Sequence, residues 1–238
     1  THDADGLRIA RPPDARAASG APAVWIFGGS FAYGWAVDDD ASLPWQLQLA
    51  RPDVEVVSFA VNGYGTLQAA VSLERALRER SAPAVVVLTY ASFHDERNTF
   101  TRRRGKRVAP FNRLGPLVQP YARLGPGGEL EIAMAEATYR PWPGQRHSAL
   151  VHRLEQLWNE LERRRVDSAA VTRALVARIV AAAQAAGARP LVATLTADAA
   201  AAAVRAHAER LGAATVDLAI ALDAPGMRHL PHAGHPGA

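Results

Sequence analysis

Five short apolar runs recur along the chain, and each has the length of a β-strand. Residues 23–27 read Ala-Val-Trp-Ile-Phe, and similar runs occupy 54–59, 84–90, 190–195 and 214–218. Runs that are apolar at nearly every position are typical of strands covered on both faces. The many β-branched residues of 84–90 favour a strand over a buried helix. We therefore expect a sheet with both faces buried.

Helical patterns separate these runs. In 66–80 the apolar residues recur at intervals of three and four, and the alanine-rich stretches 168–187 and 198–211 precede the last two strands. Alternation of strands with helices predicts a parallel sheet with helices on both faces, which is an α/β architecture.

The segment from about 100 to 147 interrupts this alternation. It contains several prolines, and its run Gly125-Pro126-Gly127-Gly128 predicts a hairpin. We interpret it as an insertion within a single domain of residues 1–238. Because it follows a strand's carboxyl end, where α/β proteins bind ligands, we expect it to act as a lid. A helical pattern resumes near Ser148, with these residues on one face: Leu150, Leu154, Leu157, Trp158 and Leu161.

Composition excludes several classes of site. The 238 residues are 49% hydrophobic and 21% charged, as in soluble globular proteins, and they contain no cysteine. Disulfides, cysteine-ligated zinc and thiol nucleophiles are thereby excluded. No apolar run reaches the roughly 18 residues of a membrane-spanning helix. The chain begins with Thr1 rather than Met, so we expect a processed product or an excised part of a longer protein, with any membrane anchor upstream.

The net charge is +4, and one basic cluster stands out: Arg102-Arg103-Arg104-Gly105-Lys106-Arg107. One interpretation of residues Arg102 to Arg107 is a solvated loop. The other is a site for an anionic ligand, either an anionic polymer or a phospholipid surface. Nucleic acid is not expected as a partner, because no recognition helix or stacking motif accompanies the cluster.

A candidate nucleophile follows the first apolar run, in Gly28-Gly29-Ser30-Phe31. A serine on a tight glycine turn between strand and helix stands above the sheet edge where ligands bind. The following helix offers it unpaired backbone N–H groups. The alternative is that Ser30 only caps the helix, a role that serine fills well.

Polar motifs also follow other strands. Asn62-Gly63-Tyr64-Gly65 comes after the second, Ser92-Phe93-His94-Asp95 after the third, and Ala233-Gly234-His235-Pro236-Gly237 lies near the C-terminus. A serine, a glycine, a polar donor and a histidine in this order resemble the SGNH (GDSL-type) hydrolases. The lead-in Asp5-Gly6-Leu7-Arg8 is similar to the subset with Gly-Gly-Ser in place of Gly-Asp-Ser.

The resemblance implies a three-layer α/β/α sandwich whose five-stranded parallel sheet has the order 2-1-3-4-5. It also implies ester hydrolysis or acyl transfer through a serine nucleophile, without a cofactor. We expect a substrate bearing O-acyl or O-acetyl groups, either a carbohydrate or a lipid-linked molecule. Such relatives are often parts of larger exported or membrane-associated proteins, so we expect an extracytoplasmic location, periplasmic or secreted.

Family roles carry over to particular residues. Ser30 matches the nucleophile, and its N–H and that of Gly63 match two oxyanion donors. His94 stands where the family has an asparagine, and an imidazole N–H also donates to an oxyanion. The alternative for His94 is a histidine bonded to Asp95, either at the surface or behind the site without touching the substrate. His235 matches the general base that activates the serine.

One departure concerns the acid. The family places an aspartate two or three residues before the histidine, where this chain has Ala233 and His232. Three alternatives remain open: a natural dyad, a catalytically inactive module that binds carbohydrate or a partner, and an Asp→Ala inactivated variant. A structural domain, docking a partner through 100–147, is a further alternative.

Three histidines near the C-terminus invite a metal interpretation. His229, His232 and His235 are spaced by three, and three histidines can hold zinc. Pro231 and Gly234 would break any helix that aligned them, so we expect no metal.

Overall fold

The structure is a computed structural model that describes residues 1–12, 15, 20–113 and 115–219. The chain divides into two compact units. The first unit combines Thr1–Ser92 with the segment that begins at Leu175, and the second is Phe93–Ala174. The second unit thus extends beyond the expected insertion at both ends, and each unit is described by itself.

The first unit is built on a parallel sheet of five strands, in the order β2-β1-β3-β6-β7. The strands are β1 (Ala23–Phe27), β2 (Glu55–Ser58), β3 (Val85–Tyr90), β6 (Arg189–Thr194) and β7 (Ala214–Asp217). This confirms the expected fold class. The expected order 2-1-3-4-5 differs only in numbering, because β4 and β5 belong to a separate hairpin.

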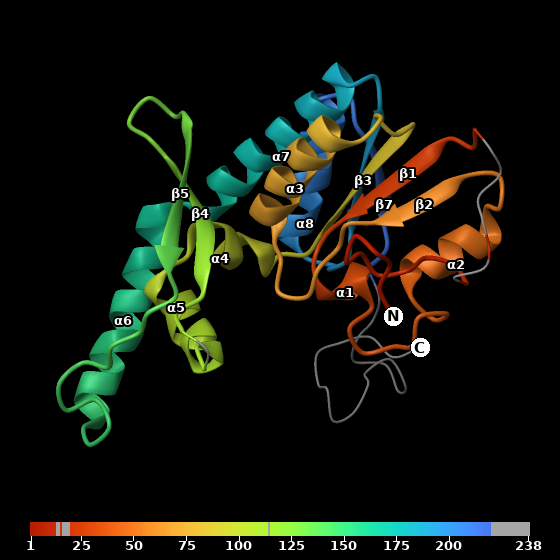
Figure 1. Cartoon of the computed structure of the whole chain (residues 1–238). Helices are drawn as coiled ribbons and strands as arrows, with labels where there is room; N and C mark the ends of the chain where they lie inside the picture. Colours follow the sequence, from red (N-terminus) through yellow and green to blue (C-terminus); the bar gives the residue numbers. More distant parts are fainter. Residues whose placement is uncertain (13–14, 16–19, 114, 220–238) are drawn as a thin grey trace. The chain divides into compact units, whose positions relative to one another are not determined.

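Helices cover both faces of this sheet. Figure 1 shows α3 (Thr66–Glu79), α7 (Ser168–Ala185) and α8 (Ala199–Arg210) together on one side, with α1 (Ser30–Tyr33) and α2 (Leu43–Ala50) on the other. From Leu175 onward, α7 belongs to this unit. Crossovers between parallel strands are right-handed, so the side on which the next strand is added decides which face of the sheet the connecting helix covers. From β1 the chain adds β2 on one side, and afterwards it adds β3, β6 and β7 in the opposite direction. The helices of this unit that precede β2 therefore lie on one face, and those that precede the later strands lie on the other.

The core of the first unit explains the continuous apolar runs. Trp25, Ile26 and Phe27 of β1 are each no more than 3% exposed, although successive side chains point to opposite faces. The Phe27 ring stacks on Phe59 with centroids 4.8 Å apart, and Trp25 meets Phe59 edge-on at 5.1 Å. Leu67 and Leu73 of α3 are fully buried, as the helical spacing predicts.

The second unit pairs a two-stranded antiparallel hairpin with helices. The hairpin confirms the turn predicted at 125–128, since Leu124 pairs with Leu130 across it and Gly128 has φ +85°. That backbone conformation favours glycine. The elements are α4 (His94–Thr99), α5 (Arg102–Val108), a 3₁₀ turn (Ala109–Phe111), β4 (Val118–Leu124), β5 (Leu130–Glu136) and α6 (Ala149–Val166).

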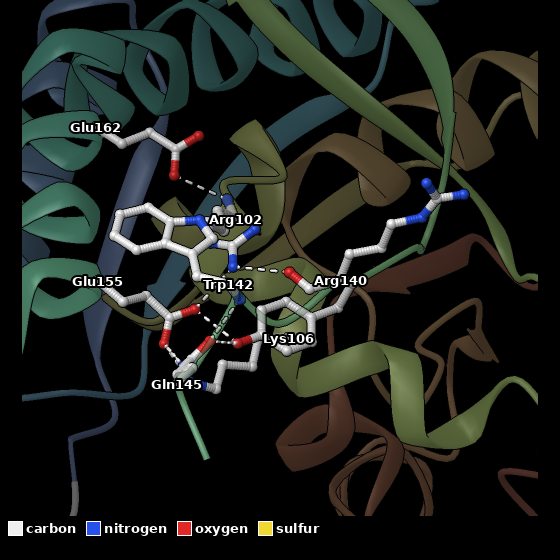
Figure 2. A network of polar contacts seen from close by, with 8 residues as sticks. Arg102, Lys106, Arg140, Trp142, Gln145, Glu155 and Glu162 are labelled. Carbon is white, nitrogen blue, oxygen red and sulfur yellow. Dashed lines mark hydrogen bonds and ion pairs between the residues drawn. The ribbon is translucent and has the colours of Figure 1, made fainter. Parts of the chain in front are cut away.

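A buried carboxylate organises this unit. Glu155 of α6 is 1% exposed and accepts hydrogen bonds from Arg102 at 3.0 Å, Lys106 at 2.5 Å and the Tyr139 hydroxyl at 2.6 Å. Gln145 also donates to it, as Figure 2 shows. Burial alone would raise the pKa of Glu155, but the hydrogen bonds from Lys106 and Tyr139 and the charge of Lys106 lower it to about 2.

Candidate functional site

Ser30 stands at the carboxyl edge of the first unit's sheet. It is the first residue of α1, three residues after β1 ends, and only 3% of it is exposed. Gly29 is the N-cap, so the interpretation of Ser30 as the helix cap is wrong. Within the described residues, neither the Ser30 hydroxyl nor its N–H makes a hydrogen bond. The hydroxyl is thus not committed to a structural contact there.

The turn before Ser30 requires glycine at position 28. The Thr89 hydroxyl donates to the Phe27 carbonyl at 3.1 Å, which places Thr89 against the end of β1. A Cβ on Gly28 would lie 1.8 Å from Thr89 Oγ1, far inside van der Waals contact. Only a residue without a side chain lets β1 and β3 stay paired this close to the nucleophile turn.

Arg8 holds the loop that follows Ser30. Its buried guanidinium donates to the carbonyls of Tyr33 at 2.6 Å and Val37 at 2.8 Å, and also to that of Gly34. Its Nε donates to Asp39 Oδ1 at 2.8 Å. One planar fork thus satisfies three carbonyls and a carboxylate of the same loop, a task that a lysine could not perform.

Gly63 lies on the neighbouring loop of the same sheet edge. It follows β2, which pairs with β1 in parallel register through Ile26 and Ser58. The Val61 N–H donates to the Gly28 carbonyl at 3.1 Å, which ties this loop to the nucleophile turn. Gly63 has φ +86°, a conformation suited to glycine. The structure therefore brings the turns that carry Ser30 and Gly63 together.

His94 belongs to the second unit, where it is the first residue of α4. It is 1% exposed, so His94 is not a surface histidine, while a place behind the site remains an alternative. Burial disfavours the imidazolium and the nearby Arg97 charge adds to this effect, which together lower the pKa of His94 to about 3. A histidine with this pKa is neutral at physiological pH. It can donate one N–H but is a poor base.

The remaining predicted site residues lie elsewhere. His235 and Ala233 lie outside the described residues, as do His229 and His232 of the metal interpretation. Within the described ranges, no group of three or more histidine or acidic side chains is placed to hold a metal ion. No described helix is long and apolar enough to cross a membrane.

The basic cluster is not a solvated loop, because Arg102–Val108 forms helix α5. Thr101 caps this helix, and its hydroxyl accepts from the Arg104 N–H at 3.5 Å. Arg103 and Arg107 pair with Glu96 at 3.2 and 3.1 Å, while Arg102 and Lys106 face Glu155. Four of its cations thus already contact carboxylates, and the anionic ligand at this cluster stays a prediction.

Sequence reasoning did not find the parts played by Arg8 and Thr89. In the sequence Arg8 stands out only as part of Asp5-Gly6-Leu7-Arg8, and no local pattern shows that it reaches a loop some 30 residues away. Thr89 is one of several β-branched residues in its strand, and the sequence does not show that its hydroxyl contacts the end of β1. A glycine directly after a buried strand, as Gly28 is here, indicates that another part of the chain or a ligand approaches the backbone closely at that point.

No family model and no curated protein matches the chain. Among solved structures, TesA is 16% identical with a TM-score of 0.50, and the match covers 90% of this chain and 89% of TesA. A mutant of the esterase AlinE4 is 13% identical with a TM-score of 0.44, covering 82% of this chain and 75% of that one. The likeness to TesA shows that this chain has the same α/β fold, as the resemblance to the SGNH hydrolases implied.

Proposed function

We propose that this chain is an SGNH-type ester hydrolase or acyltransferase with Ser30 as its nucleophile. The observation that carries the proposal is the position of Ser30. It stands on a turn held by Arg8, Gly28 and Thr89, at the sheet edge where α/β proteins bind ligands. Its hydroxyl makes no hydrogen bond within the described residues, as suits a group that must meet a substrate.

In the proposed reaction, Ser30 Oγ attacks an ester carbonyl while His235 takes the hydroxyl proton. The N–H groups of Ser30 and Gly63 donate to the oxyanion of the tetrahedral intermediate, and His94 is the proposed third donor. Collapse of the intermediate breaks the ester bond, and His235 returns its proton to the leaving alkoxide. Water or an acceptor alcohol then attacks the acyl-Ser30 ester while His235 takes its proton. The acyl group leaves as a carboxylic acid or a new ester, and His235 returns the proton to Ser30 Oγ.

The low pKa of His94 suits a hydrogen-bond donor better than a base, because a neutral imidazole keeps its N–H at physiological pH. We further propose O-acyl or O-acetyl groups on a carbohydrate or lipid-linked molecule as substrate, in an extracytoplasmic compartment. The proposed reaction needs only these side chains and backbone N–H groups, together with the ester and the water or alcohol that accepts the acyl group.

The test combines turnover with active-site labelling. We expect the chain to hydrolyse p-nitrophenyl acetate, even if slowly, and a fluorophosphonate to label it at Ser30. Ser30→Ala should abolish both, whereas Ser81→Ala, at an exposed serine, should change neither. Labelling that persists in Ser30→Ala would overturn the assignment of the nucleophile.

A second candidate is a module of the same fold that binds carbohydrate or a partner without catalysis. Ala233 favours it, because the family's aspartate is absent from that position. Such a module should bind an acylated glycan yet show neither turnover nor fluorophosphonate labelling.

A further inference from the structure

Helix α6 exposes the apolar face that the sequence pattern identified. A surface helix normally buries such a stripe, but here the opposite side packs inward and carries the buried Glu155. Single exposed apolar residues are common on protein surfaces, whereas a contiguous apolar face of this kind usually marks a binding surface. The exposed residues and fractions are Leu150 69%, Leu154 47%, Leu157 55%, Trp158 45% and Leu161 56%.

The stripe continues into a groove between α6 and β4. The groove has a volume of about 480 Å³, and its apolar wall includes Leu124, Trp158 and Leu161. Trp158 and Leu161 belong to both the stripe and the groove. The two features therefore form one surface, which we call the α6 face.

Two arginines line the same groove. Among the described residues, neither Arg123 nor Arg165 forms an ion pair with a carboxylate, and Arg123 lies over the Tyr121 ring at 5.1 Å. The one carboxylate in the groove, Glu162, accepts a hydrogen bond from the Arg102 N–H at 2.8 Å (Figure 2). The α6 face thus combines apolar side chains with two arginines that form no ion pair among the described residues, although Glu131 lies opposite Arg123 in the hairpin.

The charge of the second unit decides which partner fits this face. The unit contains fifteen Lys and Arg against nine Asp and Glu, a net charge of +6, while the rest of the chain has twelve against fourteen, a net charge of −2. Two α6 faces brought together would oppose two strongly positive units, which disfavours a second copy. An anionic partner with an apolar interior is complementary in both respects.

We propose that the α6 face docks on the surface of an anionic phospholipid bilayer. A helix with leucine and tryptophan on one face and arginines beside them is the kind that lies in the plane of a membrane interface. The leucines and Trp158 would enter the boundary between headgroups and acyl chains, while Arg123 and Arg165 would meet lipid phosphates. This surface is distinct from the basic cluster of α5, whose cations face carboxylates, and it does not depend on the chemistry of Ser30.

Sedimentation with vesicles tests the proposal. The chain should bind vesicles of phosphatidylcholine with phosphatidylglycerol, bind pure phosphatidylcholine far more weakly, and lose affinity as salt rises. Replacing both Arg123 and Arg165 with serine should weaken binding by about fivefold per arginine. Leu157→Ser with Leu161→Ser should weaken it by at least tenfold. Each of these side chains is exposed, so the fold should persist.

Matched controls change charge or apolar surface elsewhere. Arg51→Ser with Arg75→Ser makes the same charge change at exposed positions of the first unit, and Leu49→Ser alters a leucine that is 61% exposed. Both controls should bind like the unaltered chain. Equal binding to neutral vesicles, no binding at all, or equal losses in test and control variants would overturn the proposal. So would a stable dimer that Leu157→Ser dissociates, since a second copy would then occupy the face.

Discussion

Arg8 and Asp39 form an ion pair at 2.8 Å, and through it the N-terminal lead-in of the chain is fastened to the loop that follows Ser30. The side chain of Arg8 is 7% exposed and that of Asp39 is 20% exposed. Loss of the guanidinium would leave three carbonyls of the loop without their donor, and Asp39 would keep only its 2.8 Å contact with the Thr1 ammonium. The pair therefore links folding to the placement of the proposed nucleophile.

We expect Arg8→Gln to lower the free energy of unfolding by about 3 kcal/mol, because three loop carbonyls lose a largely buried, charged donor. Urea unfolding with an unchanged m-value measures this loss. Arg11→Gln is the matched control, because Arg11 pairs with the exposed Glu55 and should cost less than about 1 kcal/mol. Equal losses of unfolding free energy in the two variants would show that the contacts of Arg8 with the loop do not stabilise the fold.

The close approach of Gly28 to Thr89 gives a second prediction. Gly28→Ala should destabilise the chain by about 1–3 kcal/mol, because the added methyl group overlaps Thr89 Oγ1. The double variant Gly28→Ala, Thr89→Ala should regain part of that loss, since the nearest remaining contact would be 3.1 Å, to the Cβ of residue 89. A double-mutant cycle on unfolding free energies measures the coupling. Strictly additive losses would contradict the proposed clash.

Acid should weaken the second unit through Glu155. Its pKa is about 2 in the folded protein against an ordinary value of 4.5, so its contribution to stability is full above pH 4.5 and is lost as the pH falls toward 2. The unfolding free energies of the unaltered chain and of Glu155→Gln should therefore converge by roughly 3 kcal/mol across that range. Glu160→Gln, which removes an exposed carboxylate from the same helix, is the control. A gap that stays constant between pH 5 and pH 2.5 would contradict the lowered pKa.

His94 gives a prediction about rate and pH. If its N–H stabilises the oxyanion, His94→Ala should reduce kcat by about 10²–10³, while His94→Asn, which restores an N–H donor, should retain more activity. The pH profile of kcat/KM should show no step from His94 between pH 5 and 9, because its pKa lies near 3. A profile step that His94→Asn removes would mean that His94 titrates in that range and acts as a base.

The elements with continuous apolar runs were predictable, and the contacts across the chain were not. The run of β1 is buried on both faces, so its sequence alone identifies it as a sheet strand. The adjacency of the Ser30 and Gly63 turns followed from parallel topology, because the carboxyl ends of neighbouring strands share an edge. The contacts of Arg8 join residues far apart in sequence, and no local pattern encodes them.

The second unit shows two further limits of sequence reasoning. The charge density of Arg102–Val108 suggested a solvated loop, but pairing with Glu96 and Glu155 stabilises it as a helix. The periodicity of α6 identified its apolar face correctly. Periodicity does not show on which side of a helix the rest of the chain packs, and here the exposed side is the apolar one.

Position 233 gives the prediction that most directly separates enzyme from binding module. In the family this chain resembles, an aspartate near the histidine orients the imidazole and stabilises the imidazolium that forms as the serine attacks. Altering the corresponding residue of a serine protease lowers kcat by about 10⁴. If Ala233 occupies that place, Ala233→Asp should raise kcat for p-nitrophenyl acetate by orders of magnitude with a much smaller change in KM.

The control is the same substitution in a chain that also carries Ser30→Ala, which should show no gain and so tie the effect to acyl chemistry. Circular dichroism would verify that both variants keep the fold. Unchanged turnover of several short-chain esters by a folded Ala233→Asp variant would contradict the assignment of the acid position. Because the nucleophile turn and the Gly63 loop are already assembled without that carboxylate, such a result would favour a dyad or a binding module over an inactivated triad.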